Sequence, residues 1–125
     1  MEPKKRLGSD QRIRRQTTFK HLTEKGQFAR GEYFYLWVGK QGEKGQAGPK
    51  KRPVIGIIVS RQTEPTATGR NLWKRRVREI FREHQAQLHP EAICLVKMRR
   101  VRIKPPFSVL AKDLVSLFKK AGAWE

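Results

Sequence analysis

The stretch from Arg70 to Arg82 combines residue types and spacing that could carry out specific chemistry. Six of its thirteen residues are cationic. Apolar and aromatic side chains recur within it and just beyond at the spacing of one buried helix face, at Trp73, Val77, Ile80, Phe81 and His84. On a helical wheel, a polar set shares one arc beside that stripe: Asn71, Lys74, Arg75, Arg78 and Arg82. The pattern predicts a docked helix whose outer flank suits a phosphate backbone.

A solvated polar helix face is the simpler interpretation of the same residues. Such faces usually mix positive and negative charges and gain from pairs spaced i,i+4. Here only Glu79 and Glu83 stand against five or more cations, so the composition favours a surface that binds a polyanion.

The charge of the whole chain points the same way. Its 125 residues suffice for one domain with a modest core, and 29 Lys and Arg against 11 acids give a net charge of +18. A cationic excess spread along the chain indicates nucleic-acid binding. An anionic membrane is the alternative polyanion, but residues 1–10 contain no apolar signal segment and the longest apolar run, residues 54–59, cannot span a bilayer. We therefore expect no membrane association.

The polar residues form no recognisable catalytic constellation. His21, His84 and His89 lack metal-ligand spacing, and Asp113 has no acidic neighbour with which to form a two-carboxylate site. The single Cys94 lies in an apolar run and is best interpreted as a buried thiol in a reducing, cytoplasmic compartment. We expect no catalytic residue and no metal ligand in the protein itself.

Hydrophobic periodicity predicts six elements in the order helix, strand, strand, helix, strand, helix. Their expected ranges are 17–25, 32–38, 54–60, 70–88, 92–98 and 107–121. This order predicts a single α+β domain, an α-β sandwich with a small open sheet and helices mainly on one face. Residues 1–11 are predicted to be a flexible basic tail, residues 12–125 the folded domain, and residues 39–52 a flexible Gly/Lys hairpin insertion.

The first predicted strand alternates between two kinds of side chain. Phe34, Leu36 and Val38 would face the helices, while the aromatic set Tyr33, Tyr35 and Trp37 would face outward. Exposed aromatics beside positive charge bind single-stranded nucleic acid by base stacking. The alternative is that these rings fill a second core face or a strand edge, but little sequence remains to cover them.

At this point the residues match a known family. Arg70-Asn71, Lys74-Arg75, Arg78-Glu79 and Phe81-Arg82 together resemble the signature of the bacterial ribonuclease P protein subunit. The strand Gly56–Arg61 is similar to the family's approach to that signature, and Phe19 followed by Gly26 fits its first helix. The similarity covers residues 12 to about 120.

The resemblance implies an α-β sandwich with a left-handed βαβ crossover, and an accessory role in a tRNA 5′-maturation endoribonuclease whose catalyst is a partner RNA that uses Mg²⁺. The protein would be monomeric, bind that RNA through the basic helix, and hold the single-stranded 5′ leader of precursor tRNA against the open sheet face. Together with the residue patterns above, it assigns two sets. The catalytic-RNA-binding residues are Arg70, Asn71, Lys74, Arg75, Arg78 and Arg82. The leader-binding residues are Phe19, Tyr33, Tyr35, Trp37, Ser60 and Arg61.

Three positions depart from the family pattern. Leu72 stands where a second Arg is usual, Thr23 replaces a common aromatic, and the linker from Ser60 to Arg70 is about a residue longer. Two other classes stay open. A structural RNA-binding protein, such as a small ribosomal protein, would explain the charge without needing an aromatic groove. A double-stranded DNA binder would need a helix that reads base edges, for which Asn71 alone is thin support.

Overall fold

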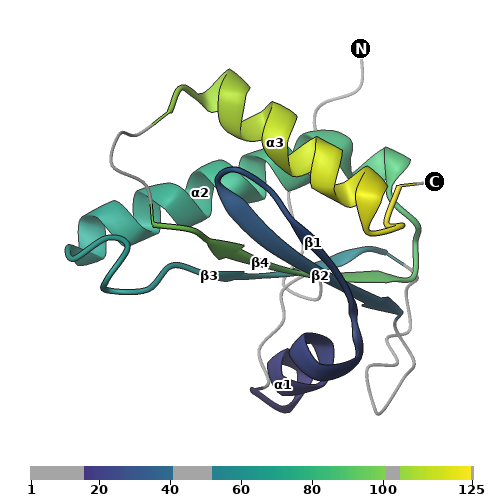
Figure 1. The fold of residues 1–125 in the computed structure, drawn as a ribbon. Helices are drawn as coiled ribbons and strands as arrows, with labels where there is room; N and C mark the ends of the chain where they lie inside the picture. The colour runs from purple at the N-terminus through teal and green to yellow at the C-terminus, as the bar shows by residue number, and fades with distance from the viewer. Residues whose placement is uncertain (1–15, 41–51, 101–104, 125) are drawn as a thin grey trace.

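The computed structural model describes residues 16–40, 52–100 and 105–124, arranged as a four-stranded sheet between two helical layers (Figure 1). The helices are α1 (Gln16–Lys25), α2 (Ala67–His84) and α3 (Phe107–Lys120), with a 3₁₀ turn, η3, at Gln85–Gln87. The strands are β1 (Gln27–Arg30), β2 (Phe34–Lys40), β3 (Val54–Ile58) and β4 (Ala92–Met98). The predicted α+β class is therefore confirmed.

The sheet has the strand order β1-β2-β4-β3. β1 pairs antiparallel with β2, β2 pairs antiparallel with β4, and β3 lies parallel to β4 at the far edge. Because parallel neighbours need a crossover, α2 forms the βαβ unit that the resemblance requires. The handedness of that crossover stays a prediction.

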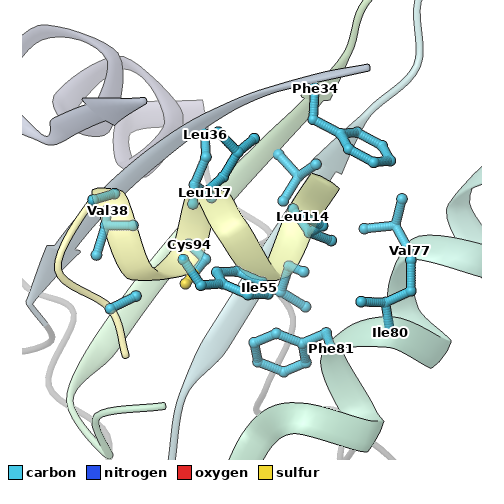
Figure 2. Close-up of a cluster of buried hydrophobic side chains, with 14 of the residues drawn as sticks. Phe34, Leu36, Val38, Ile55, Val77, Ile80, Phe81, Cys94, Leu114 and Leu117 are labelled. Carbon is cyan, nitrogen blue, oxygen red and sulfur yellow. The ribbon is translucent and has the colours of Figure 1, made fainter. Parts of the chain in front are cut away.

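Alternation along β4 separates the two faces of the sheet. Cys94 and Val96 pack into the main core with α2 and α3. Figure 2 shows Cys94 among the buried side chains of this core. Ile93 and Leu95 point the other way and form a smaller cluster with Leu22 of α1. Two of the three helices thus cover one face, as predicted, while α1 covers only part of the opposite face (Figure 1).

The strand β1 was not predicted from the sequence. It has only four residues, too few to show a convincing alternation, and its pairing with β2 depends on a tight turn. In that turn, the backbone N–H groups of Glu32 and Tyr33 each donate to the Asp113 carboxylate of α3, at 3.1 Å. β2 therefore begins at Phe34, later than the predicted start at Glu32.

Gly31 allows the close approach between that turn and α3. A Cβ atom at this position would lie 2.6 Å from Asp113 Oδ2 and 2.9 Å from Leu117 Cδ1. Both distances are shorter than real Cβ contacts, so any larger residue at this position would require the Asp113 and Leu117 side chains to move.

Several helix boundaries differ from the prediction by a few residues. α2 begins three residues early because Thr66 caps it, its hydroxyl accepting from the N–H of Gly69 at 3.0 Å. Gly69 is thus inside the helix and does not break it, and α2 ends at His84, before the predicted Leu88. α3 ends at Lys120, one residue before the predicted end, and Gly122 follows with a φ of 80°.

Some predictions fall outside the described residues. The basic tail at 1–11 is among them, as is most of the insertion predicted at 39–52. β2 continues through Gly39 and Lys40, so any insertion begins later than predicted. Within the described ranges, no helix is both long enough and apolar enough to cross a membrane.

Candidate nucleic-acid interface

Three aromatic rings lie together on the sheet face opposite α2 and α3. Tyr35 and Trp37 alternate with Leu36, which faces the main core. Phe28 of β1 is the register partner of Trp37 and so lies on the same face. Ring centroids are 5.1 Å apart for Phe28 and Trp37, 5.8 Å for Phe28 and Tyr35, and 6.2 Å for Tyr35 and Trp37. The predicted outward placement of Tyr35 and Trp37 is confirmed.

Cationic side chains surround these rings. Tyr35 has Arg30 as its register partner on β1 and Lys97 as its partner on β4, and both cations are exposed. The guanidinium carbon of Arg99 lies 5.3 Å from the centroid of the Tyr35 ring, within cation–π range. We call this surface, Phe28, Arg30, Tyr35, Trp37, Lys97 and Arg99, the aromatic–cationic face.

The position of Arg99 is fixed by its contacts with the β1–β2 turn. Its backbone N–H donates to the carbonyl of Tyr33 at 2.9 Å, and its side-chain Nη1 donates to the carbonyl of Gly31 at 2.5 Å. Because the Nη1 bond holds the guanidinium, the positive charge over Tyr35 is already in place before any ligand arrives.

Helix α1 borders the aromatic–cationic face. Phe19 is half-buried and packs against the small cluster of Leu22, Ile93 and Leu95, which Trp37 also contacts. Gly39 lets α1 sit on the sheet, since a Cβ there would come within 2.8 Å of Leu22 Cδ2. Phe19 and Trp37 are thereby brought to one junction between α1 and the sheet, as the resemblance implies.

Tyr33 does not belong to this face, so its predicted outward placement is wrong. It lies before β2 begins, where the turn breaks the strand alternation, and it packs partly against the main core. The pKa of its phenol is raised by partial desolvation and then by the nearby Glu32 and Asp113 carboxylates. Its position is explained by the turn rather than by an RNA surface.

Ser60 and Arg61 lie in the turn that follows β3. The Ser60 hydroxyl lies 3.0 Å from the Thr63 hydroxyl and accepts from the Thr63 N–H at 3.2 Å, and its carbonyl accepts from Thr63 and Glu64. Ser60 therefore shapes this turn, while the side chain of Arg61 is exposed. A role for either residue in leader binding stays a prediction.

The predicted basic strip on α2 divides into two groups. Asn71 and Arg75, one helical turn apart, are exposed, and Lys74 and Arg78 are half-buried beside them. Contacts within the protein anchor Arg70 and Arg82. Arg70 donates to the carbonyls of Glu64 and Pro65 at 3.1 and 2.9 Å, and Arg82 pairs with Glu79. Arg70 thus braces the loop before α2, a contact that the sequence pattern did not reveal.

Leu72 lies on the outer side of the same helix and is 39% exposed. Its neighbour Trp73 is buried, with the Arg76 guanidinium 5.3 Å from its ring. The departure from the family pattern is therefore at the surface and does not alter the core.

Four members of the aromatic–cationic face were not among the site residues predicted from the sequence: Phe28, Arg30, Lys97 and Arg99. Phe28 and Arg30 were missed because β1 was. Lys97 carried a usable signal, since it is the single charged residue in the otherwise apolar strand β4 and must point to an uncovered face.

The potentially reactive side chains are occupied by structural contacts. Cys94 is buried, which raises the pKa of its thiol to about 12. His84 Nδ1 lies 2.9 Å from the Ile80 carbonyl and its ring packs 6.0 Å from Trp124. Among the described residues, no three His, Cys, Asp or Glu side chains gather closely enough to hold a metal ion.

A hollow of about 650 Å³ lies beyond the C-terminal end of α1, lined by Lys25, Lys40, His89 and Glu91 among others. None of its lining residues belongs to the aromatic–cationic face, so this hollow is a separate feature of the surface.

The fold and these two surfaces define a small basic α+β protein equipped to bind a polyanionic strand. Its sequence matches the family model described as Ribonuclease P over residues 7–122. The chain belongs to the ribonuclease P protein family.

Relatives and solved structures agree with this membership. The "Ribonuclease P protein component" of Pseudanabaena sp. is 31% identical over 115 residues, covering 92% of this chain and 94% of that protein. The RNase P protein of Thermotoga maritima is similar with a TM-score of 0.71 and 28% identity, covering 87% of this chain and 96% of that one. The Staphylococcus aureus RNase P protein gives a TM-score of 0.77 at 22% identity, covering 92% and 98%, and shows likeness of fold.

Proposed function

We propose that this protein is the subunit that assists an RNA catalyst in removing the 5′ leader from precursor tRNA. Membership of the ribonuclease P protein family supports a part in tRNA processing. The observation that carries the finer proposal is the aromatic–cationic face, where three rings and three cations lie on the side of the sheet opposite α2 and α3. A small ribosomal protein, the alternative weighed from the sequence, is not favoured by the family match.

The aromatic–cationic face suits an unpaired strand for two physical reasons. Bases can stack on exposed aromatic rings whatever their identity, which fits leaders of varied sequence. Phosphates passing over the rings would meet Arg30 and Lys97 on either side of Tyr35. The protein would therefore distinguish precursor from mature tRNA by the presence of a single strand.

The catalytic RNA would bind on the outer flank of α2. Asn71 and Arg75 are exposed there, and Lys74 and Arg78 lie beside them. Arg70 would act mainly by bracing the loop before the helix, given its two bonds to backbone carbonyls. The two surfaces belong to different elements, so one protein could hold the RNA catalyst and its substrate together.

We also propose that the Mg²⁺ required for cleavage is held by the partner RNA. A protein with a net charge of +18 repels a divalent cation but lowers the RNA's own need for counterions. We further propose that the protein acts as a monomer in the cytoplasm, where the unpaired, buried thiol of Cys94 would stay reduced.

The test is cleavage of precursor tRNA by a bacterial ribonuclease P RNA at low Mg²⁺, with and without this protein. We expect the protein to raise the rate of RNA-catalysed cleavage and to cleave nothing alone. Metal-dependent cleavage by rigorously RNA-free protein would overturn the proposal, as would the lack of any rate increase. The Arg75→Ala/Arg78→Ala double variant is the matched control for specific docking.

A further inference from the structure

Phe28 is 52% exposed, the highest value among the large apolar side chains of the described residues. Leu72 and Val109 are also exposed, at 39% and 38%, but neither belongs to the cluster of aromatic rings. Single exposed apolar residues are common on protein surfaces and need no explanation. Phe28 is different because its ring packs against two others with cations on the same face.

The other two rings of the aromatic–cationic face are less available to a ligand. Arg99 lies over Tyr35 at 5.3 Å, and Trp37 packs against the Leu22 cluster beneath α1. Phe28 belongs to the edge strand β1, which pairs only with β2 in the sheet. The most exposed ring of the aromatic–cationic face is therefore at the outer edge of the sheet.

The cations continue toward that edge. Arg30 follows Phe28 by two residues, so its side chain emerges on the same face about 7 Å away. It is exposed, as is Lys97 two strands away. A base stacked on Phe28 would thus have a cation close by for its phosphate.

We propose that Phe28 stacks an unpaired leader base and carries the leader path from the α1 junction across β2 to the outer edge of β1. This inference rests on the proposed function, because it takes the single strand to be the leader. It adds one residue to the leader site and orders two contacts: the nucleotide on Phe28 lies further from the cleavage site than the nucleotide on Trp37. Phe28 offers no hydrogen-bonding group, so it senses leader length and strandedness rather than base sequence.

The experiment uses the holoenzyme assembled from this chain and a bacterial ribonuclease P RNA. Binding of precursor tRNA is measured as the leader is lengthened one nucleotide at a time. Phe28→Leu keeps an apolar side chain but removes the π face, while Phe28→Trp keeps the π face. Val109→Ala, an exposed apolar residue on α3, is the matched control.

We expect Phe28→Leu to match the wild type on short leaders and to bind long leaders about 5- to 150-fold more weakly, the range that one stacked base provides. Phe28→Trp should bind long leaders at least as tightly as the wild type. If Phe28→Leu reproduces the whole wild-type length profile, or loses affinity equally at every length, the inference is wrong.

A second measurement does not depend on how the variants fold. A photoreactive base placed at successive leader positions of the wild-type complex should cross-link to β1 at one position beyond those that cross-link to β2. Absence of any β1 cross-link while β2 is labelled would overturn the Phe28 assignment and leave the proposed function intact. A wild-type holoenzyme that binds all leader lengths like mature tRNA would overturn both.

Discussion

Replacing Asp113 with Ala should loosen the turn that positions β1. The carboxylate accepts two backbone N–H groups, from Glu32 and Tyr33, both at 3.1 Å. A hydrogen bond to a charged group contributes about 1.5–3 kcal/mol, and less where it is exposed, as at Glu32. Losing both bonds, at about 1–1.5 kcal/mol each, lowers the free energy of unfolding, and the better helix propensity of Ala offsets about 0.5 kcal/mol of that loss. The free energy of unfolding should therefore fall by about 2 kcal/mol.

Chemical denaturation, extrapolated to water, measures this loss, with Lys112→Ala on the exposed side of α3 as the control. For a chain of this size the melting temperature should also fall by roughly 6–10 °C. Because Phe28 and Arg30 lie on the strand that the turn holds, long-leader binding should weaken as well. An Asp113→Ala protein as stable as the control would refute the argument that the carboxylate ties the turn to α3.

A double-mutant cycle sharpens the test. Gly31→Ala alone should be strongly destabilising because its Cβ would lie 2.6 Å from Asp113 Oδ2. In the Asp113→Ala background that contact is gone and only Leu117 remains in the way, so Gly31→Ala should cost less. Additive losses would show that the two residues do not interact as the structure places them.

Three further predictions concern the basic helix, the aromatic–cationic face and the core. The Arg75→Ala/Arg78→Ala variant should bind the catalytic RNA with a weaker salt dependence: the slope of log affinity against log salt concentration should fall by somewhat under about 1 per lost phosphate contact. An unchanged slope would contradict the assignment. Leu72→Arg, at an exposed position, should bind the catalytic RNA equally or more tightly. Trp37→Ala, checked for folding by thermal melting, should weaken long-leader precursor tRNA by about 1–3 kcal/mol relative to mature tRNA, whereas equal losses would remove Trp37 from the leader site. The thiol of Cys94 has a pKa of about 12 in the folded protein and of 9.0 when exposed in the unfolded chain, so only the unfolded chain loses this proton between those pH values. The contribution of Cys94 to the free energy of unfolding should therefore fall by about 1.4 kcal/mol per pH unit in that window. Cys94→Ala should show a shallower fall when unfolding is measured against pH.

Much of the fold could be predicted because its signals are local. The apolar stripe of α2, the apolar run of β4 and the apolar face of α3 are patterns within neighbouring residues, and each element lies where predicted to within a few positions. The alternation of Tyr35 and Trp37 with Leu36 likewise identified the uncovered face. The signature beginning at Arg70 identified the family, which the match over residues 7–122 confirms.

The rest depended on contacts between residues far apart in the chain. The β1–β2 turn is held by a carboxylate about 80 residues away, and Arg99 reaches the Gly31 carbonyl over a separation of 68 residues. No periodicity encodes such pairs, so β1 and the exposed ring of Phe28 were missed and Tyr33 was placed on the wrong face. Similarly, charge alone could not separate Arg70, which binds backbone carbonyls, from the exposed Arg75. The sequence determined the family and every described element except β1 and the short η3 turn. Tertiary packing decided which donors and rings the protein uses for its own contacts, because those contacts join residues far apart in the chain.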